Sequence, residues 1–320
     1  MHIKKVKNIF STVPKDKFSN DWKTSKYMFK HPQLHLITAP RGTGKTYLMS
    51  KIVLAGLEEN LYDRIFLISP TAVSNKKQIQ DLNIEEEDIY EPTVDAIQMI
   101  MNEVEAERDE YQTYLDEMEL YNAIINNKNN DFTDADLEVI DDFMVDGELV
   151  KPTYKRKNPR RPQCLCILDD ILNTPVMSNG SSINRLFTIN RHIAPMRDGG
   201  ALGLGVIILT QTYSTTQGQG LSRALRENLT ELSIFRNKAE GQMNKMMSEF
   251  GGAIDLEKFK KAYDVAIKND FDNLTISFGR LACNTMRFRR NLNEFIVFPE
   301  DDKECKCKGK KGKKIELKIT

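Results

Sequence analysis

A lysine and a threonine close a glycine-containing turn at residues 39–46, which read Ala-Pro-Arg-Gly-Thr-Gly-Lys-Thr. Backbone N–H groups in such a turn point at a bound anion, and the helix that follows presents its positive end to the same charge. We expect Lys45 to reach the β- and γ-phosphates of ATP, and the hydroxyl of Thr46 to ligate Mg²⁺. The predicted nucleotide-binding residues are Arg41, Gly42, Thr43, Gly44, Lys45 and Thr46.

The turn departs from the phosphate-loop pattern at one position. The pattern G-x-x-x-x-G-K-[ST] begins with glycine, and Ala39 stands there in this chain. A small residue should still permit the turn. The alternative is a chance glycine turn before a helix, but the apolar run before it and the helical pattern after it favour phosphate binding.

Two carboxylates, Asp169 and Asp170, directly follow the apolar run 164–168. Ligands of open α/β sheets bind at the carboxyl ends of the strands. We expect Asp169 to hold Mg²⁺ and Asp170 to orient or polarise the attacking water, although Asp is shorter than the Glu often used in that role. Alone, the pattern would indicate a strand followed by a turn; together with the upstream loop it favours catalysis.

A further polar residue, Gln211, follows the apolar run 205–210. Glutamine both donates and accepts hydrogen bonds, so Gln211 can bridge the γ-phosphate and the attacking water. The other interpretation is a glutamine that only caps a strand end. The order of the motifs favours the functional one.

Arginines further along the chain are candidates for completing the site of a neighbouring subunit. Arg223 and Arg226 stand at positions i and i+3, on one face of a predicted helix. An arginine brought to the γ-phosphate stabilises the charge of the transition state. Arg191, followed by His192, is another polar pair. Each of these side chains has the alternative of a solvated surface charge, and the sequence does not separate Arg223 from Arg226.

The elements that must position these residues follow from the alternation of short aliphatic runs with helical patterns. This alternation predicts an α/β fold with a mostly parallel sheet. The expected strands are 34–38, 65–69, 165–168, 205–210 and 232–235, and the expected helices are 44–60, 94–127, 221–228, 238–250 and one starting near residue 256.

The domain organisation follows composition and charge. We expect a basic N-terminal segment at 1–30, an ATPase core at 31–250, a C-terminal part of the core or small subdomain at 251–300, and a basic tail at 301–320. Residues 83–162 form an acidic insertion with apolar residues at helical spacing, which predicts a helical hairpin. Residues 151–162 should form an exposed basic connector.

Composition bounds the class of protein. The 320 residues are 40% apolar and can bury one large core or two smaller ones. No apolar run predicts a membrane span, and the N-terminus lacks the apolar region of a secretory signal. Cys164 and Cys166 are expected to be buried free thiols, and Cys305 and Cys307 lack partners at zinc spacing, which suits a reducing compartment. Net charge is zero, but local basic stretches keep nucleic acid as a partner.

The order of the motifs resembles the genome-packaging ATPases of nucleocytoplasmic large DNA viruses and virophages, which belong to the FtsK–HerA class of P-loop DNA translocases. The resemblance covers residues 30–240 and rests on 39–46, 65–71, 168–170, 191–192, 209–211 and 225–228. It implies a RecA-like P-loop core, a homo-oligomeric ring around double-stranded DNA, ATP-driven packaging into a preformed capsid, and an arginine that acts in trans. It also implies a capsid or portal-like vertex partner, and a place in the viral factory of the host cytoplasm and in the virion.

Three other functions stay open from the sequence. A helicase or AAA+ remodeller would share the phosphate loop, but no clear helicase motif set follows the aspartate pair. A small-molecule kinase would need a lid and an acceptor pocket, which the residues after Asp170 do not suggest. A non-hydrolysing nucleotide-binding virion scaffold would not need the pairing of Lys45 with two carboxylates.

Overall fold

The computed structural model describes residues 27–72, 81–126, 140, 143–145, 148–156, 160–178, 180–213, 221–236, 240–252, 254–279 and 284–304. Most of the predicted basic N-terminal segment (1–30) and most of the predicted basic tail (301–320) lie outside these residues, at 1–26 and 305–320, and so do Cys305 and Cys307. Within the described part of the chain, every helix is too short or too polar to be a membrane span.

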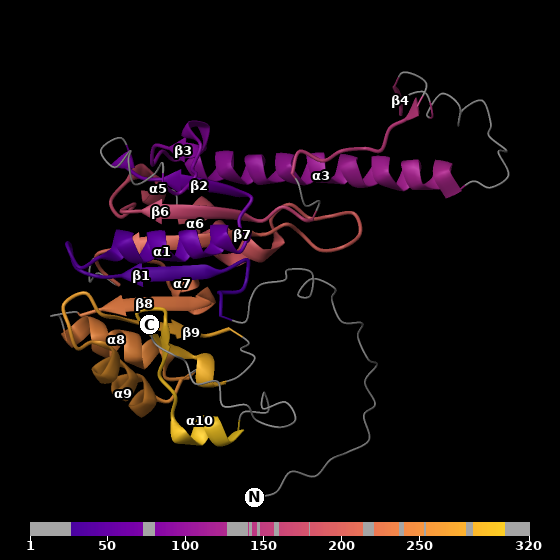
Figure 1. The fold of residues 1–320 in the computed structure, drawn as a ribbon. Helices are drawn as coiled ribbons and strands as arrows, with labels where there is room; N and C mark the ends of the chain where they lie inside the picture. The colour runs from indigo at the N-terminus through magenta and orange to yellow at the C-terminus, as the bar shows by residue number, and fades with distance from the viewer. Residues whose placement is uncertain are drawn as a thin grey trace, which may run out of the picture.

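A nine-stranded sheet dominates the described structure, in the order β11-β10-β9-β8-β1-β7-β6-β2-β3 (Figure 1). Strands β8, β1, β7, β6, β2 and β3 run parallel, and β9, β10 and β11 continue the sheet in antiparallel fashion. The strands are β1 (Leu34–Thr38), β2 (Arg64–Ile68), β3 (Ile89–Tyr90), β6 (Cys164–Asp169), β7 (Leu204–Thr210), β8 (Glu231–Phe235), β9 (Asn273–Ser277), β10 (Phe288–Arg290) and β11 (Glu294–Phe295).

The order of the parallel strands confirms the predicted α/β class with a mostly parallel central sheet. Strand β7 lies between β1, which leads into the phosphate loop, and β6, which ends in the aspartate pair. Because these strands are parallel, their carboxyl ends meet at one edge of the sheet. The residues after β1, β6 and β7 are therefore neighbours, although they are far apart in the sequence.

Helices cover both faces of the sheet (Figure 1). They are α1 (Lys45–Glu58), α3 (Ala96–Asn126), α5 (Pro175–Ser178), α6 (Gly180–Ile189), α7 (Arg223–Asn228), α8 (Glu240–Phe250), α9 (Leu256–Ala266) and α10 (Pro299–Glu304), with short 3₁₀ turns η3 (Glu86–Asp88), η4 (Asn190–His192) and η5 (Asn284–Met286). Alternate residues of the strands enter two hydrophobic clusters, one on each face: Leu36 belongs to one and Ile37 to the other. Cys164 and Cys166 are buried free thiols, as predicted.

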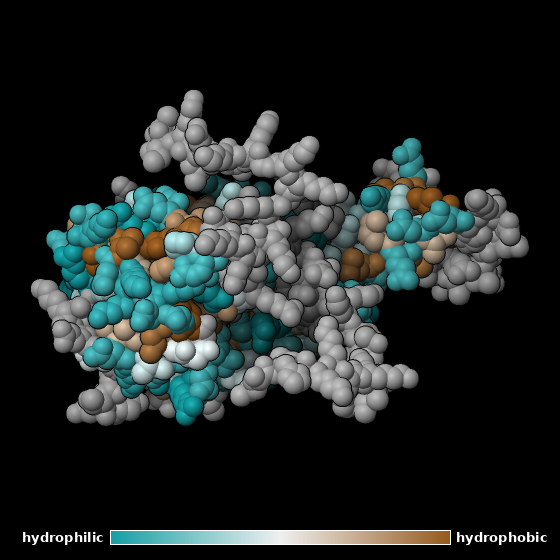
Figure 2. All heavy atoms as spheres, turned by 90° about the horizontal axis from the view of Figure 1, so that it is seen from below, coloured by the Kyte–Doolittle hydropathy of each residue, from teal (hydrophilic) through white to brown (hydrophobic). Residues whose placement is uncertain are grey.

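Helix α3 projects well beyond the sheet (Figure 1). Its first half is anchored in the core by buried residues such as Ile100 and Val104. Near its outer end, β4 (Met144–Val145) pairs with β5 (Glu148–Leu149), and hydrophobic side chains lie exposed among hydrophilic ones there (Figure 2). Ile125, for example, is 55% exposed.

The described part of the insertion holds α3, the first helix of the predicted hairpin. The second helix would lie within 127–142, where residue 140 is helical and the others are outside the described residues, so the hairpin stays a prediction. The connector is not simply exposed. Arg156 is partly buried because its guanidinium donates to Glu107 and to the carbonyl oxygen of Asp63.

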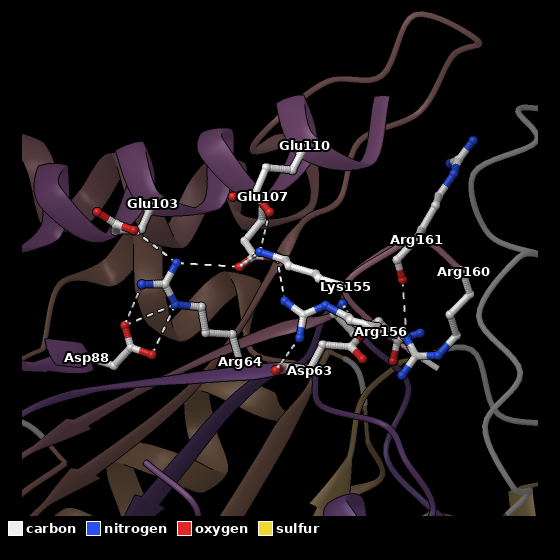
Figure 3. Close-up of polar contacts among 11 residues, drawn as sticks. Asp63, Arg64, Asp88, Glu103, Glu107, Glu110, Lys155, Arg156, Arg160 and Arg161 are labelled. Carbon is white, nitrogen blue, oxygen red and sulfur yellow. Dashed lines mark hydrogen bonds and ion pairs between the residues drawn. The ribbon is translucent and has the colours of Figure 1, made fainter. Parts of the chain in front are cut away.

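The base of α3 is fastened by an ion-pair network, which we call the α3 clamp: Asp63, Arg64, Asp88, Glu103, Glu107, Glu110, Lys155, Arg156 and Arg160 (Figure 3). Glu107 is only 3% exposed and accepts from Lys155 at 2.9 Å and from Arg156. Burial alone would raise the pKa of Glu107, but these hydrogen bonds outweigh it and leave the pKa below its ordinary value. The charge of Glu107 is therefore compensated within the protein.

Candidate nucleotide-binding site

The phosphate loop joins the end of β1 to the start of α1 at Lys45. Gly42 and Gly44 adopt φ values of 78° and 98°, a left-handed conformation that residues with a Cβ resist. The hydroxyl of Thr43 donates to the carbonyl oxygen of Pro40 at 2.7 Å, and Lys45 Nζ donates to the carbonyl oxygen of Ala39 at 3.2 Å. The loop thus holds Lys45 on a backbone oxygen that a phosphate oxygen can replace.

Ala39 does not strain the loop. Glycine is required where φ is positive, and Ala39 is not one of the residues with positive φ. Its N–H donates to the carbonyl oxygen of Thr210 at 3.1 Å, and its methyl group is buried in the hydrophobic cluster that contains α1. The departure from the sequence pattern therefore replaces a glycine that this backbone does not need.

The aspartate pair and Gln211 lie together at the ends of β6 and β7. Gln211 Nε2 donates to both carboxylate oxygens of Asp170, at 3.2 and 3.1 Å. Asp170 has φ of 53°, a left-handed conformation that Asp tolerates better than most residues. These contacts fix the orientation of the Asp170 carboxylate at the edge where the phosphate loop also lies.

Ser69, which follows β2, is a site residue to which the sequence assigned no role, although it lies in the stretch 65–71 that contributes to the family resemblance. Its hydroxyl donates to Asp169 Oδ2 at 3.3 Å and lies 3.2 Å from the hydroxyl of Thr71. The sequence signal was present, since Ser69 ends a predicted strand of the same parallel sheet. Ser69 orients Asp169 as Gln211 orients Asp170.

The charges of this edge are poorly compensated. Burial lowers the pKa of Lys45, against the opposing effects of Asp170 and Asp169. Burial also raises the pKa of Asp169, helped by the neighbouring charge of Asp170 and opposed by Ser69 and Lys45. Each group would therefore gain from a ligand that supplies the missing charge, and such perturbed groups in a cleft are typical of functional sites.

The residues present fit a magnesium–nucleotide ligand. Mg²⁺ prefers oxygen ligands and usually keeps several waters beside one or two carboxylates and substrate phosphates. Asp169 and Thr46, in the first turn of α1, are both partly buried and offer such oxygens. In the described residues, no group of three or more His, Cys, Asp or Glu forms a metal site by itself. Phosphate oxygens and water would complete the coordination shell.

The arginines lie on a different part of the fold. Arg223 begins α7, is 83% exposed and pairs with Glu227 at 2.6 Å. Arg226 is 14% exposed, and its Nε donates to Glu249 of α8 at 2.8 Å. The structure brings neither arginine to Asp169, Asp170 or Lys45 of the same chain. Arg191 and His192 are exposed in η4, and Arg41 is exposed in the phosphate loop.

Comparison with known proteins gives structural similarity alone. No family model and no curated protein matches the chain. The structure is similar to the genome packaging NTPase B204 from Sulfolobus turreted icosahedral virus 2, with 11% identity, 81% of this chain and 97% of that chain covered, and a TM-score of 0.42.

Two further similar structures are longer than this chain. The pCW3 conjugation coupling protein TcpA has 12% identity and a TM-score of 0.43, with 86% of this chain and 63% of that chain covered. EssC (ATPases 2 and 3) from Geobacillus thermodenitrificans has 15% identity and a TM-score of 0.38, with 68% and 35% covered. The chain thus spans about a third of that EssC structure and less than two thirds of that of TcpA.

Proposed function

We propose that this chain hydrolyses ATP with Mg²⁺ and uses the energy to move double-stranded viral DNA into a preformed capsid, as a ring of identical subunits. One observation carries the ATPase part. Lys45, Asp169 and the Asp170–Gln211 pair share the carboxyl edge of three adjacent parallel strands. This edge combines a phosphate cradle, an oxygen ligand for Mg²⁺ and a carboxylate placed to act on water.

The role of each residue follows from its contacts. The N–H groups of the phosphate loop and the first turn of α1 bind phosphate oxygens, and Lys45 exchanges the Ala39 carbonyl for a phosphate oxygen. Thr46 and Asp169 would hold Mg²⁺, which would supply positive charge to the phosphates. Asp170 accepts a hydrogen bond from the attacking water, and takes its proton as the water oxygen bonds to the γ-phosphorus and the bond from that phosphorus to the bridging oxygen of the leaving ADP breaks. Gln211 holds the carboxylate of Asp170 by its hydrogen bonds, and it contacts the γ-phosphate when that phosphate is bound.

The DNA-translocating part of the proposal rests on the motif order and on charge. The motif order resembles packaging ATPases, and basic stretches at 1–30 and 303–318 supply charge for phosphate contacts. Of the two candidate arginines, we assign Arg223 to the neighbouring subunit's γ-phosphate. It is 83% exposed and bound only within its own helix, whereas Arg226 is held by Glu249. A capsid vertex would be the docking partner, in the viral factory and the virion.

The ATPase proposal is tested by Lys45→Ala. We expect ATP hydrolysis to be abolished, while Lys51→Ala, on the same helix, keeps the native rate because Lys51 contacts the ring of Tyr47. Hydrolysis by Lys45→Ala at the native rate would contradict the site assignment.

The DNA part is tested separately. Duplex DNA should raise the ATPase rate of the assembled protein, and imaging with an ATP analogue and duplex DNA should show closed rings. A rate indifferent to DNA, in rings, would indicate a motor for another substrate. Tight nucleotide binding without phosphate release would indicate a scaffold.

A further inference from the structure

One carboxylate oxygen in α8 joins the nucleotide edge to the arginine helix. Glu249 Oε2 accepts a hydrogen bond from Arg226 Nε at 2.8 Å and another from the hydroxyl of Tyr213. The Arg226 guanidinium also lies 5.6 Å from the centre of the Tyr213 ring, within the range of a cation–π contact. These three side chains, which we call the Tyr213 relay, come from three separate segments of the chain.

Tyr213 is held firmly to α8. Its side chain is fully buried, and its ring makes an edge contact with Phe250 at 6.2 Å. Its backbone N–H donates to Gln242 Oε1 at 3.0 Å, so α8 holds both ends of the residue. Burial, with the hydrogen bond to Glu249 and its charge, raises the pKa of Tyr213, so the phenol keeps the proton that it donates.

Tyr213 is also close in the chain to the nucleotide edge. It follows Gln211 by two residues, and Gln211 is bonded to Asp170. A shift of Gln211 when the γ-phosphate is bound or lost would therefore be passed along a short segment, from the exposed Gln211 to the buried ring of Tyr213. Because interiors are close-packed, the ring can move only together with Glu249 and Arg226.

The other end of the relay reaches the surface. A hollow of about 760 Å³ lies beside α7 and α8, and its lining includes Arg223, Arg226, Glu227, Ser248 and Glu249. Arg226 also donates to the carbonyl oxygen of Leu221, just before α7, and so fixes the start of this helix. The position of Arg226 therefore sets where Arg223, one turn earlier on α7, stands at the surface.

We propose that Tyr213 and Glu249 are positioning residues which, through Arg226, couple the state of Gln211 in one subunit to the placement of Arg223 in the site of its neighbour. This inference rests on the proposed function, since it needs a ring in which Arg223 acts in trans. It adds a path by which hydrolysis in one site can control hydrolysis in the next.

Two variants test the relay with little change in volume. Tyr213→Phe removes only the hydroxyl, and Glu249→Gln removes only the charge. Because both leave the phosphate loop untouched, we expect the Kd for an ATP analogue to stay within about twofold of native and kcat to fall about 10- to 100-fold at unchanged KM. Glu257→Gln, which breaks an exposed pair with Lys261 on α9, is the control and should have no effect. Native kcat in both relay variants would overturn the inference.

Mixing subunits separates a trans effect from local damage. Subunits with Lys45→Ala cannot hydrolyse ATP but keep a native α7. Added to Glu249→Gln subunits, they should raise hydrolysis above the sum of the two proteins measured apart, because native arginines then serve the intact sites. The matched mixture contains Lys45→Ala and Arg223→Ala subunits. If hydrolysis in this mixture exceeds the sum of its parts but the mixture with Glu249→Gln gives only the simple sum, the relay is overturned. If Arg223→Ala is not rescued either, the trans site of the proposed function fails, and the relay with it.

Discussion

The nucleotide edge and the α3 clamp are both groups of partly buried charged side chains. The pKa values of their central residues are shifted in opposite directions. In the clamp, the pKa of Glu107 is lowered and the pKa of Lys155 is raised, so these two charges are stabilised by their partners despite burial, whereas burial raises the pKa of Asp63, another member of the clamp. At the nucleotide edge, the pKa of Lys45 is lowered and that of Asp169 is raised, so each charge is disfavoured. The clamp is complete without a ligand, whereas the nucleotide edge is not.

The difference separates a structural role from a functional one. A compensated network holds an element in place, here the base of α3 against β2. A network whose charges are not compensated within the protein can be stabilised by a ligand that brings the opposite charges. Substitutions in the clamp should therefore affect stability, and substitutions at the nucleotide edge should affect ligand binding and rate.

The largest expected effect is on rate, at Asp170. Asp170→Asn keeps the shape of the side chain but removes the proton acceptor, so kcat should fall about 10²- to 10⁴-fold. The free energy of unfolding should change little, because the Asp170 side chain contacts Gln211 at an exposed edge and Asn keeps one oxygen that can accept from Gln211 Nε2. Steady-state phosphate release and urea unfolding measure the two quantities. If Asp170→Asn keeps the native kcat but loses much of its stability, Asp170 has a structural role and the comparison is contradicted.

The next effect is on stability, at Glu107. Glu107→Ala leaves Arg156 and Lys155 without their buried partner, so the free energy of unfolding should fall by about 3–5 kcal/mol. Glu110→Ala, which also pairs with Lys155 but is 56% exposed, should cost at most about 1 kcal/mol. Urea unfolding of both variants gives the values, and equal losses would show that burial of Glu107 does not matter.

A smaller effect distinguishes the two regions by pH. The folded-state pKa of Glu107 lies below the ordinary 4.5, so its contribution is full above that pH and is lost as pH falls through the lowered pKa. The pKa of Asp169 lies above the ordinary 3.8, so ionising it costs stability as pH rises from 3.8 through the raised pKa.

Unfolding measured across the acid range should show these opposite trends. The stability advantage of the native protein over Glu107→Gln should shrink on acidification. Asp169→Asn should gain on the native protein as the pH rises. If the free energy of unfolding of both variants changes with pH in the same way as that of the native protein, the two regions do not differ in their electrostatics.

The sequence predicted the elements whose pattern is local. The aliphatic runs of β1, β2, β6, β7 and β8 identify buried parallel strands, and the loop and aspartate motifs locate the edge of the candidate site. Strand β9 was missed because Asn273, Thr275 and Ser277 alternate with its two apolar residues. Helix α6 was missed because Gly180 and the serines after it are typical of a turn.

Other features depend on residues far apart in the chain. Arg223 and Arg226 are equivalent in the sequence, and Glu249, 23 residues beyond Arg226, makes the difference between them. The burial of Arg156 likewise depends on Glu107, 49 residues earlier. Neither the hydrogen bond of Ser69 to Asp169 nor that of Gln211 to Asp170 has a local pattern, since both require the strand order.

The central claim is that the charges at the nucleotide edge are not compensated within the protein. Its most direct test is thermal unfolding of the native protein and of Asp169→Asn. Each is measured without ligand and with a non-hydrolysable ATP analogue, in the presence and absence of Mg²⁺. The native protein should be stabilised more by the analogue with Mg²⁺ than by the analogue alone. Asp169→Asn without ligand should unfold at or above the native temperature, and its Mg²⁺-dependent increment should vanish. A ligand-free variant that unfolds well below native and keeps the full Mg²⁺ increment would contradict the account.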